Sequence, residues 1–138
     1  LLRYNNGENV MTLAYWCVLA AIFLPYLSTG IAKFQGGFGA RQNHNPREFL
    51  ETLEGGRKRA HWAQLNGFEI TPAFAAAVII AHLAATSPQG TIDGIALAFV
   101  LSRVMFTVCY VADWASARTL VWAFGMGCIV ALFVGVGG

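Results

Sequence analysis

Four long apolar stretches divide this sequence, at about residues 10–32, 60–86, 93–112 and 118–137. Each is close to the 20 helical residues that cross the hydrocarbon core of a bilayer. Lipid offers no partner to backbone N–H and C=O groups, so a spanning segment must be a helix or belong to a closed barrel. Runs such as residues 74–81 lack the alternation of barrel strands. The sequence therefore predicts an all-α membrane protein, an up-down four-helix transmembrane bundle.

The composition agrees with a lipid environment. Of the 138 residues, 57% are hydrophobic and 12% are charged, whereas soluble domains are about 25% charged. A formal net charge of +2, with no basic patch among exposed aromatics, argues against a nucleic-acid partner. Three cysteines lie inside apolar stretches without metal-ligand spacing, so neither a disulfide framework nor a metal site is predicted. These cysteines are Cys17, Cys109 and Cys128.

The polar residues are distributed unevenly between the ends of the chain and the loops. Residues 1–10 are polar and lack the basic start of a signal peptide. They are expected to be an N-terminal tail, native or foreign to the protein, before a single domain at residues 11–138. The loop at residues 33–59 carries six of the nine basic residues. Positive charge marks the cytoplasmic side, so this loop is predicted to be cytoplasmic and both termini to lie outside.

Charged residues inside the spans are candidates for function, because a charge at mid-bilayer costs about 2.5–3.5 kcal/mol. In the second span, Asn66 and Glu69 follow Arg59 and Trp62 on one helical stripe. An amide and a carboxylate beyond an arginine suit a peptide-like ligand that bears an ammonium group. The alternative is that they hydrogen-bond between helices and hold the bundle together. In the third span, Arg103 is expected to form an ion pair with Glu69.

The segment from residue 45 to residue 81 resembles the MAPEG family, the membrane-associated proteins of eicosanoid and glutathione metabolism. Its most specific part is an Arg, Asn, Glu and Pro pattern with intervals of six, two and two residues, formed by Arg59, Asn66, Glu69 and Pro72. The segment from Arg103 to Tyr110, followed by residues 118 and 122, is similar to the next motif of the family. The resemblance covers most of residues 11–138 and is closest to small bacterial members.

The resemblance implies a four-helix fold that assembles as homotrimers, with glutathione bound at subunit boundaries towards the cytoplasm. Asn66 and Glu69 match glutathione contacts, and Gln64 matches a contact just before them. Arg103 and Tyr110 match an Arg and a Tyr of the third helix. Arg118 resembles the arginine that stabilises the glutathione thiolate, which makes it the candidate catalytic residue. A guanidinium beside a thiol lowers the thiol pKa from its free value of about 8.5.

Three residues depart from the pattern of the family's enzymes. Trp62 stands where several members carry an arginine that contacts glutathione. Ile70 and Phe106 occupy positions where some members have a tyrosine that contacts glutathione. The spacing from Tyr110 to Arg118 also differs from the family arrangements. These departures leave the predicted fold unchanged and bear only on the activity.

Three functions remain open on the sequence. The preferred one is a glutathione-dependent transferase or peroxidase in the bacterial cytoplasmic (inner) membrane, acting on lipophilic electrophiles or lipid hydroperoxides. The second is a non-catalytic membrane scaffold, lipid-binding module or accessory subunit of a larger complex. The third is a small proton-coupled transporter, which normally carries its essential Glu in the first helix, and the first helix here is uncharged.

Overall fold

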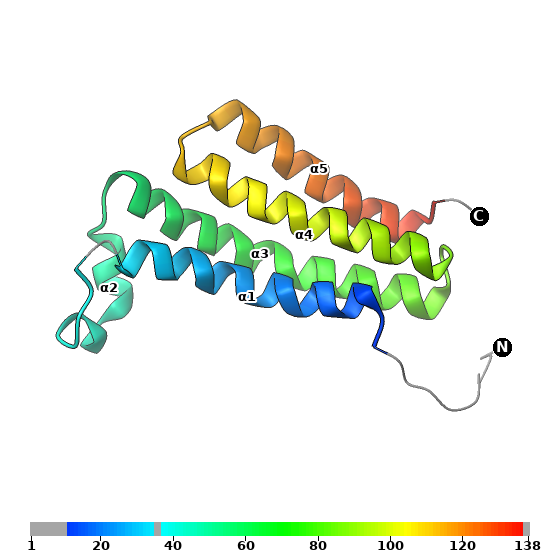
Figure 1. Ribbon diagram of the computed structural model, residues 1–138, viewed down its shortest axis with the longest axis horizontal. Helices are drawn as coiled ribbons and strands as arrows, with labels where there is room; N and C mark the ends of the chain where they lie inside the picture. The colour runs from blue at the N-terminus through cyan, green and yellow to red at the C-terminus, as the bar shows by residue number, and fades with distance from the viewer. Residues whose placement is uncertain (1–10, 35–36, 137–138) are drawn as a thin grey trace.

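Four long antiparallel helices form the molecule, as the computed structural model shows for residues 11–34 and 37–136. They are α1 (Leu13–Phe34), α3 (Gly55–Ala84), α4 (Gln89–Val111) and α5 (Ala115–Val134). Figure 1 shows that successive long helices reverse direction. The predicted up-down four-helix bundle is confirmed, and the predicted tail at residues 1–10 lies outside the described residues.

The predicted loop at residues 33–59 contains additional helical structure. A 3-10 turn, η1 (Gln42–His44), precedes a short helix, α2 (Pro46–Glu51), and α3 already begins at Gly55 instead of residue 60. Proline at the first position of α2 suits a helix start, since its fixed φ is helical and its missing N–H would be unpaired there. The basic residues at 57–59 mark the end of the apolar span, but they do not end the helix.

The long helices pack in a fixed order. α3 and α4 contact each other, α1 packs against both on one side, and α5 packs against both on the other. The turn between α4 and α5 lies at the same end as η1 and α2 in Figure 1, while the start of α1 and the end of α5 lie at the opposite end. The basic loop at residues 33–59 and the α4–α5 turn, which is followed by Arg118 in the first turn of α5, therefore lie at the same end of the molecule.

The core contains aromatic rings and small residues. Phe74 of α3 and Phe99 of α4 are fully buried and stacked, with ring centroids 3.9 Å apart. Alanines surround them and let the helix backbones approach closely, as is common in membrane bundles. The three cysteines are free and buried in the structure.

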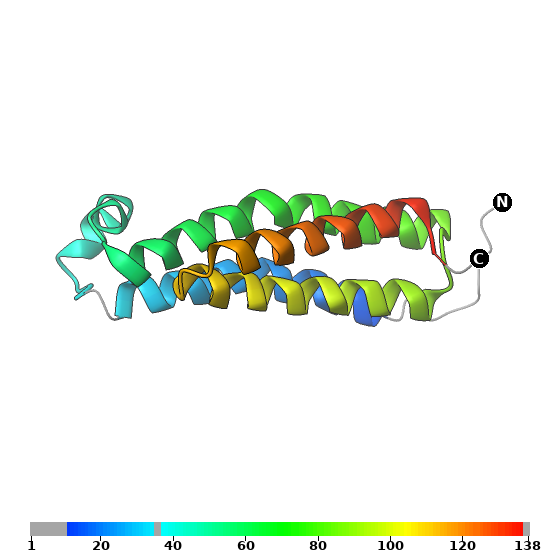
Figure 2. The same ribbon diagram turned by 90° about the horizontal axis from the view of Figure 1, so that it is seen from above.

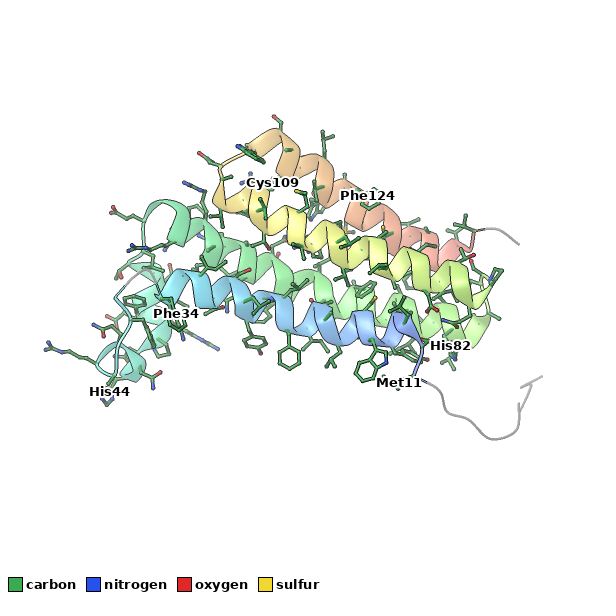
Figure 3. All side chains as sticks on the ribbon, viewed as in Figure 1. Met11, Phe34, His44, His82, Cys109 and Phe124 are labelled. Carbon is green, nitrogen blue, oxygen red and sulfur yellow. The ribbon has the colours of Figure 1, made fainter. Side chains whose placement is uncertain are left out.

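Most of the surface of the four helices is apolar. Each helix is long and apolar enough to cross a membrane. In the most apolar 18-residue stretch of each helix, at most 33% of the residues are buried within the bundle. Figure 3 shows the side chains in one view, with His44 and His82 at opposite ends of the molecule. Water would be a poor solvent for this surface. The chain is an integral membrane protein whose outer faces meet lipid or other protein.

We predict that Gly67→Ala destabilises the fold by about 1–3 kcal/mol, the usual cost of overpacking a core. A Cβ atom at Gly67 would lie 2.7 Å from Cγ of Pro25 in α1, and a proline ring cannot move away by changing rotamer. Thermal unfolding in detergent measures the effect. Gly94→Ala is the matched control, because a Cβ atom there meets nothing within 4 Å. Equal melting temperatures for the two variants would contradict the predicted contact.

Candidate functional site

A buried arginine links the two helices that carry the predicted site. Arg103 of α4 is 6% exposed, and its Nη2 atom donates a 2.7 Å hydrogen bond to Oδ1 of Asn66 on α3. The Nδ2 atom of Asn66 donates in turn to Oε2 of Glu69 at 3.4 Å. Arg103 therefore fixes which way the Asn66 amide faces, and the donor side of that amide is directed to the carboxylate.

The predicted ion pair between Arg103 and Glu69 is wrong. Among the described residues, no direct ion pair joins them, and the Asn66 amide stands between the two charged groups. The reason is their position around α3: Asn66 is half-buried, whereas Glu69 is exposed on the outer face. Glu69 is thus a carboxylate in a membrane-spanning helix that points away from the interior of its own chain.

A second pair forms at the turn between α4 and α5. The Cζ atom of Arg118 lies 4.3 Å from the ring centroid of Tyr110, a cation–π contact. The chain reverses there through Asp113, whose φ of 63° is left-handed, and Trp114 N–H donates to the carbonyl of Cys109 at 2.9 Å. This tight turn places the first turn of α5 against the last turn of α4, and so brings Arg118 to Tyr110.

Phe106 connects the two pairs. The Cζ atom of Arg103 lies 4.1 Å from the Phe106 ring centroid, and the Phe106 and Tyr110 rings meet edge to face with centroids 5.4 Å apart. Four side chains therefore form one continuous row, which we call the guanidinium–aromatic row: Arg103, Phe106, Tyr110 and Arg118. In the sequence, Phe106 was a departure from the family pattern. Its spacing of three from Arg103 and four from Tyr110 is the signal that places it between them.

Gln64 lies apart from the other predicted binding residues. It is buried, and its Oε1 atom is 3.2 Å from Nδ1 of His61. The other ring nitrogen of His61 lies 3.5 Å from Oε1 of Glu51 at the end of α2. Gln64 thus belongs to a network that joins the start of α3 to α2, and within one chain its amide is not offered to a ligand at the outer face.

Arg59, the first residue of the sequence pattern, has a packing role. Its Nε and Nη2 atoms donate to the carbonyl of Val111 at 3.1 and 3.0 Å. That carbonyl is one of the unpaired acceptors at the end of α4, so Arg59 caps α4 and holds the start of α3 against it. Trp62, on the same stripe, is exposed. The stripe therefore contains one capping residue, the exposed Trp62 and Glu69, and the half-buried Asn66 between them.

We predict that the docking of α2 on α3 weakens at acidic pH. Lys58, through a hydrogen bond and then its charge, holds the pKa of Glu51 below its ordinary value of about 4.3. A carboxyl with a lowered folded pKa contributes stability above its ordinary pKa and loses it as the pH falls through the folded value. The effect is small because Glu51 is exposed. The protection factors of the α2 amides, which correct for the slower intrinsic exchange in acid, should fall at low pH.

Glu51→Gln should remove this pH dependence. The control is Glu48→Gln on the same helix, since Glu48 forms no ion pair with the described residues. If the Glu51→Gln variant keeps the wild-type pH profile of α2 exchange, the bridge to Lys58 does not hold α2.

The fold and these contacts define a class: an integral membrane protein of four helices, with a buried guanidinium, an amide and an outward-facing carboxylate joined across two of them. The sequence comparison gives the family. The family model described as the MAPEG family matches residues 13–138, nearly the whole chain, and the chain belongs to that family. No curated protein and no solved structure matches it significantly.

Proposed function

We propose that this protein is a membrane-bound, glutathione-dependent transferase or peroxidase that acts on lipophilic electrophiles or lipid hydroperoxides. The observation that carries the proposal is the Glu69 carboxylate, exposed on the outer face of a membrane-spanning helix and contacted by Asn66. A carboxylate facing lipid costs a few kcal/mol. A ligand ammonium at this position would offset that cost, and glutathione carries one.

In this proposal Glu69 receives the ammonium group of the glutathione and Asn66 bonds its peptide groups. Arg103 is a positioning residue, because it is buried and reaches the ligand only through the Asn66 amide. The amide of Gln64 contacts His61 inside the bundle and takes no direct part in this ligand contact. Asn66 and Glu69 lie near the middle of α3.

The reaction needs a thiolate, because the thiolate and not the thiol is the nucleophile. Arg118 supplies a positive charge that lowers the thiol pKa, and the Tyr110 ring holds its guanidinium in place. In a transfer, the thiolate forms a carbon–sulfur bond and the leaving group departs with its electron pair. In a peroxide reduction, the thiolate sulfur takes the distal oxygen and the alcohol is released after protonation. A second glutathione then converts the sulfenic acid to glutathione disulfide and water.

The assembly proposed with this function is a homotrimer in the bacterial cytoplasmic membrane, with both termini on the periplasmic side. A site that faces outward from one chain is closed when a second copy covers it, which removes Glu69 from lipid. A lipophilic substrate would then reach the site from the bilayer, and glutathione would arrive from water at the end that carries the basic loop.

The second candidate is a non-catalytic membrane scaffold. It is favoured by Gln64, whose amide is turned inward to His61, and by Trp62, which is exposed in place of an arginine. Trp62 stands in place of a residue that contacts glutathione in several members of the family, and the Gln64 amide is turned away from the outer face where Glu69 lies.

Glutathione binding and turnover separate the two functions. The purified protein in nanodiscs should be stabilised by millimolar glutathione and should conjugate it to chlorodinitrobenzene or use it to reduce a lipid hydroperoxide. Arg41→Ala, in the exposed part of the loop, should retain the full activity as a control. A protein that is neither stabilised by glutathione nor active with either substrate would be a scaffold, and the proposal would fail.

A further inference from the structure

The guanidinium of Arg103 has a second terminal nitrogen that its contact with Asn66 leaves unused. Nη1 is buried and has no hydrogen-bond partner among residues 11–34 and 37–136. A buried donor without a partner costs about 1–3 kcal/mol, and more when it is charged. Buried polar groups of native proteins are nearly always paired, with protein or with ordered water. We therefore expect the Nη1 atom of Arg103 to have a hydrogen-bond acceptor.

Arg103 also lines a small, partly open cavity between α1, α3 and α4. The cavity has a volume of about 10 Å³, and a single water molecule needs roughly 10–15 Å³ measured in this way. Glutathione is far too large for it, so the cavity is separate from the proposed ligand site. The other residues of its wall are mostly small or hydroxylated: Ala21, Leu24, Pro25, Ser28, Ala63, Gly67, Thr71 and Thr107.

The hydrogen-bond donors and acceptors of the cavity wall determine which molecule or ion can bind there. Arg103 can only donate. Thr71 already donates its proton to the carbonyl of Gly67 at 2.7 Å, and Thr107 donates to the carbonyl of Arg103 at 3.1 Å. Each hydroxyl therefore keeps only lone pairs for a further partner. The occupant must accept from the guanidinium and donate to whichever threonine oxygen it contacts. Water does both, whereas a halide ion would face the lone pairs and a metal cation would face the positive charge.

We infer that one structural water molecule occupies this cavity, accepts a hydrogen bond from Nη1 of Arg103 and donates to a hydroxyl oxygen of the cavity wall. The water completes the bonding of the guanidinium in the membrane interior and leaves Nη2 to hold Asn66. It lies beside the buried guanidinium, between α1, α3 and α4. The inference stands on the ligand-free protein and does not depend on thiol binding.

A high-resolution structure of the ligand-free protein tests the inference directly. The expected result is one peak of density in the cavity, within hydrogen-bond distance of Nη1, and no anomalous signal there after bromide is exchanged for chloride. An anomalous bromide peak would show that the occupant is an anion. An empty cavity, with Nη1 bonded to a protein group, would also overturn the inference.

Solid-state NMR in bilayers gives a second measurement on the protein labelled with ¹⁵N-arginine. Magnetisation transfer from water should reach the Arg103 side chain despite its burial, and Arg103→Lys assigns the signal by removing it. The double variant Thr71→Val with Thr107→Val should lose this transfer. Thr119→Val is the matched control, because Thr119 makes the same type of bond, to the carbonyl of Ala115 at 3.1 Å, on an exposed surface. Wild-type protein without transfer to Arg103 would overturn the inference.

Discussion

Arg118→Ala is expected to lower the turnover of glutathione-dependent reactions by about 10²- to 10³-fold, the usual loss when one preorganised charge-stabilising group is removed from an active site. The Tyr110 ring holds the guanidinium at 4.3 Å, so the positive charge has a defined position before any ligand binds. Without it, the thiol pKa should return towards its free value of about 8.5. The activity of the variant should therefore recover partly at alkaline pH, whereas the wild-type activity should be nearly flat there.

The pH profile separates this role from a structural one. A variant that is merely misfolded loses activity equally at all pH values, and its melting temperature falls. Arg118→Lys should retain part of the activity, since it keeps the charge but loses the planar stacking surface. Thr119→Val, one residue further along α5, should behave as wild type. If Arg118→Ala has wild-type turnover at neutral pH, Arg118 does not activate the thiol.

Glu69→Gln is expected to weaken glutathione binding by about 30-fold or more, because removing one partner of a desolvated charge pair costs about 2–5 kcal/mol. The same substitution should leave the ligand-free protein as stable as wild type or more stable. The carboxylate is exposed on a membrane-spanning face and has no direct ion pair within its own chain among the described residues, so its charge is unfavourable there without a ligand. Calorimetric titration gives the affinity and thermal unfolding gives the stability.

The two readouts decide between ligand binding and interhelical packing. If Glu69 served mainly to hold the bundle together, Glu69→Gln would lower the melting temperature and leave the affinity almost unchanged. Glu48→Gln, in the exposed helix α2, is the control for the loss of one negative charge. It should alter neither the affinity nor the stability.

Most of the fold could be predicted from the sequence, because the solvent around the helices is lipid. Lipid cannot pair backbone groups, so four apolar stretches of this length had to be helices, and short connections had to make neighbours antiparallel. The sequence was less informative where charged residues enter the helix. Arg57, Lys58 and Arg59 looked like loop residues, but α3 begins before them at Gly55, because a positive charge marks the membrane surface and not the end of a helix.

The residues of the candidate site were identified from spacing, but their partners were not. The stripe of Asn66 and Glu69 and the stripe of Arg103, Phe106 and Tyr110 follow from the helical period alone. The helical period shows which residues share one face of a helix. Their partners on another helix depend on how the two helices are shifted along their axes and rotated about them. Only the packed structure therefore decided that Arg103 meets the Asn66 amide instead of Glu69, and that Phe106 stacks beneath its guanidinium.

The sequence by itself determined that this chain is a four-helix membrane protein of the MAPEG family, with two charges inside its spans. The tertiary structure decided that one of these charges is internal and the other external. Arg103 is enclosed between helices, where an amide meets it, and Glu69 faces outward, where its own chain cannot neutralise it. Burial is a property of packed neighbours, so residues of similar cost in lipid can have opposite environments on adjacent helices.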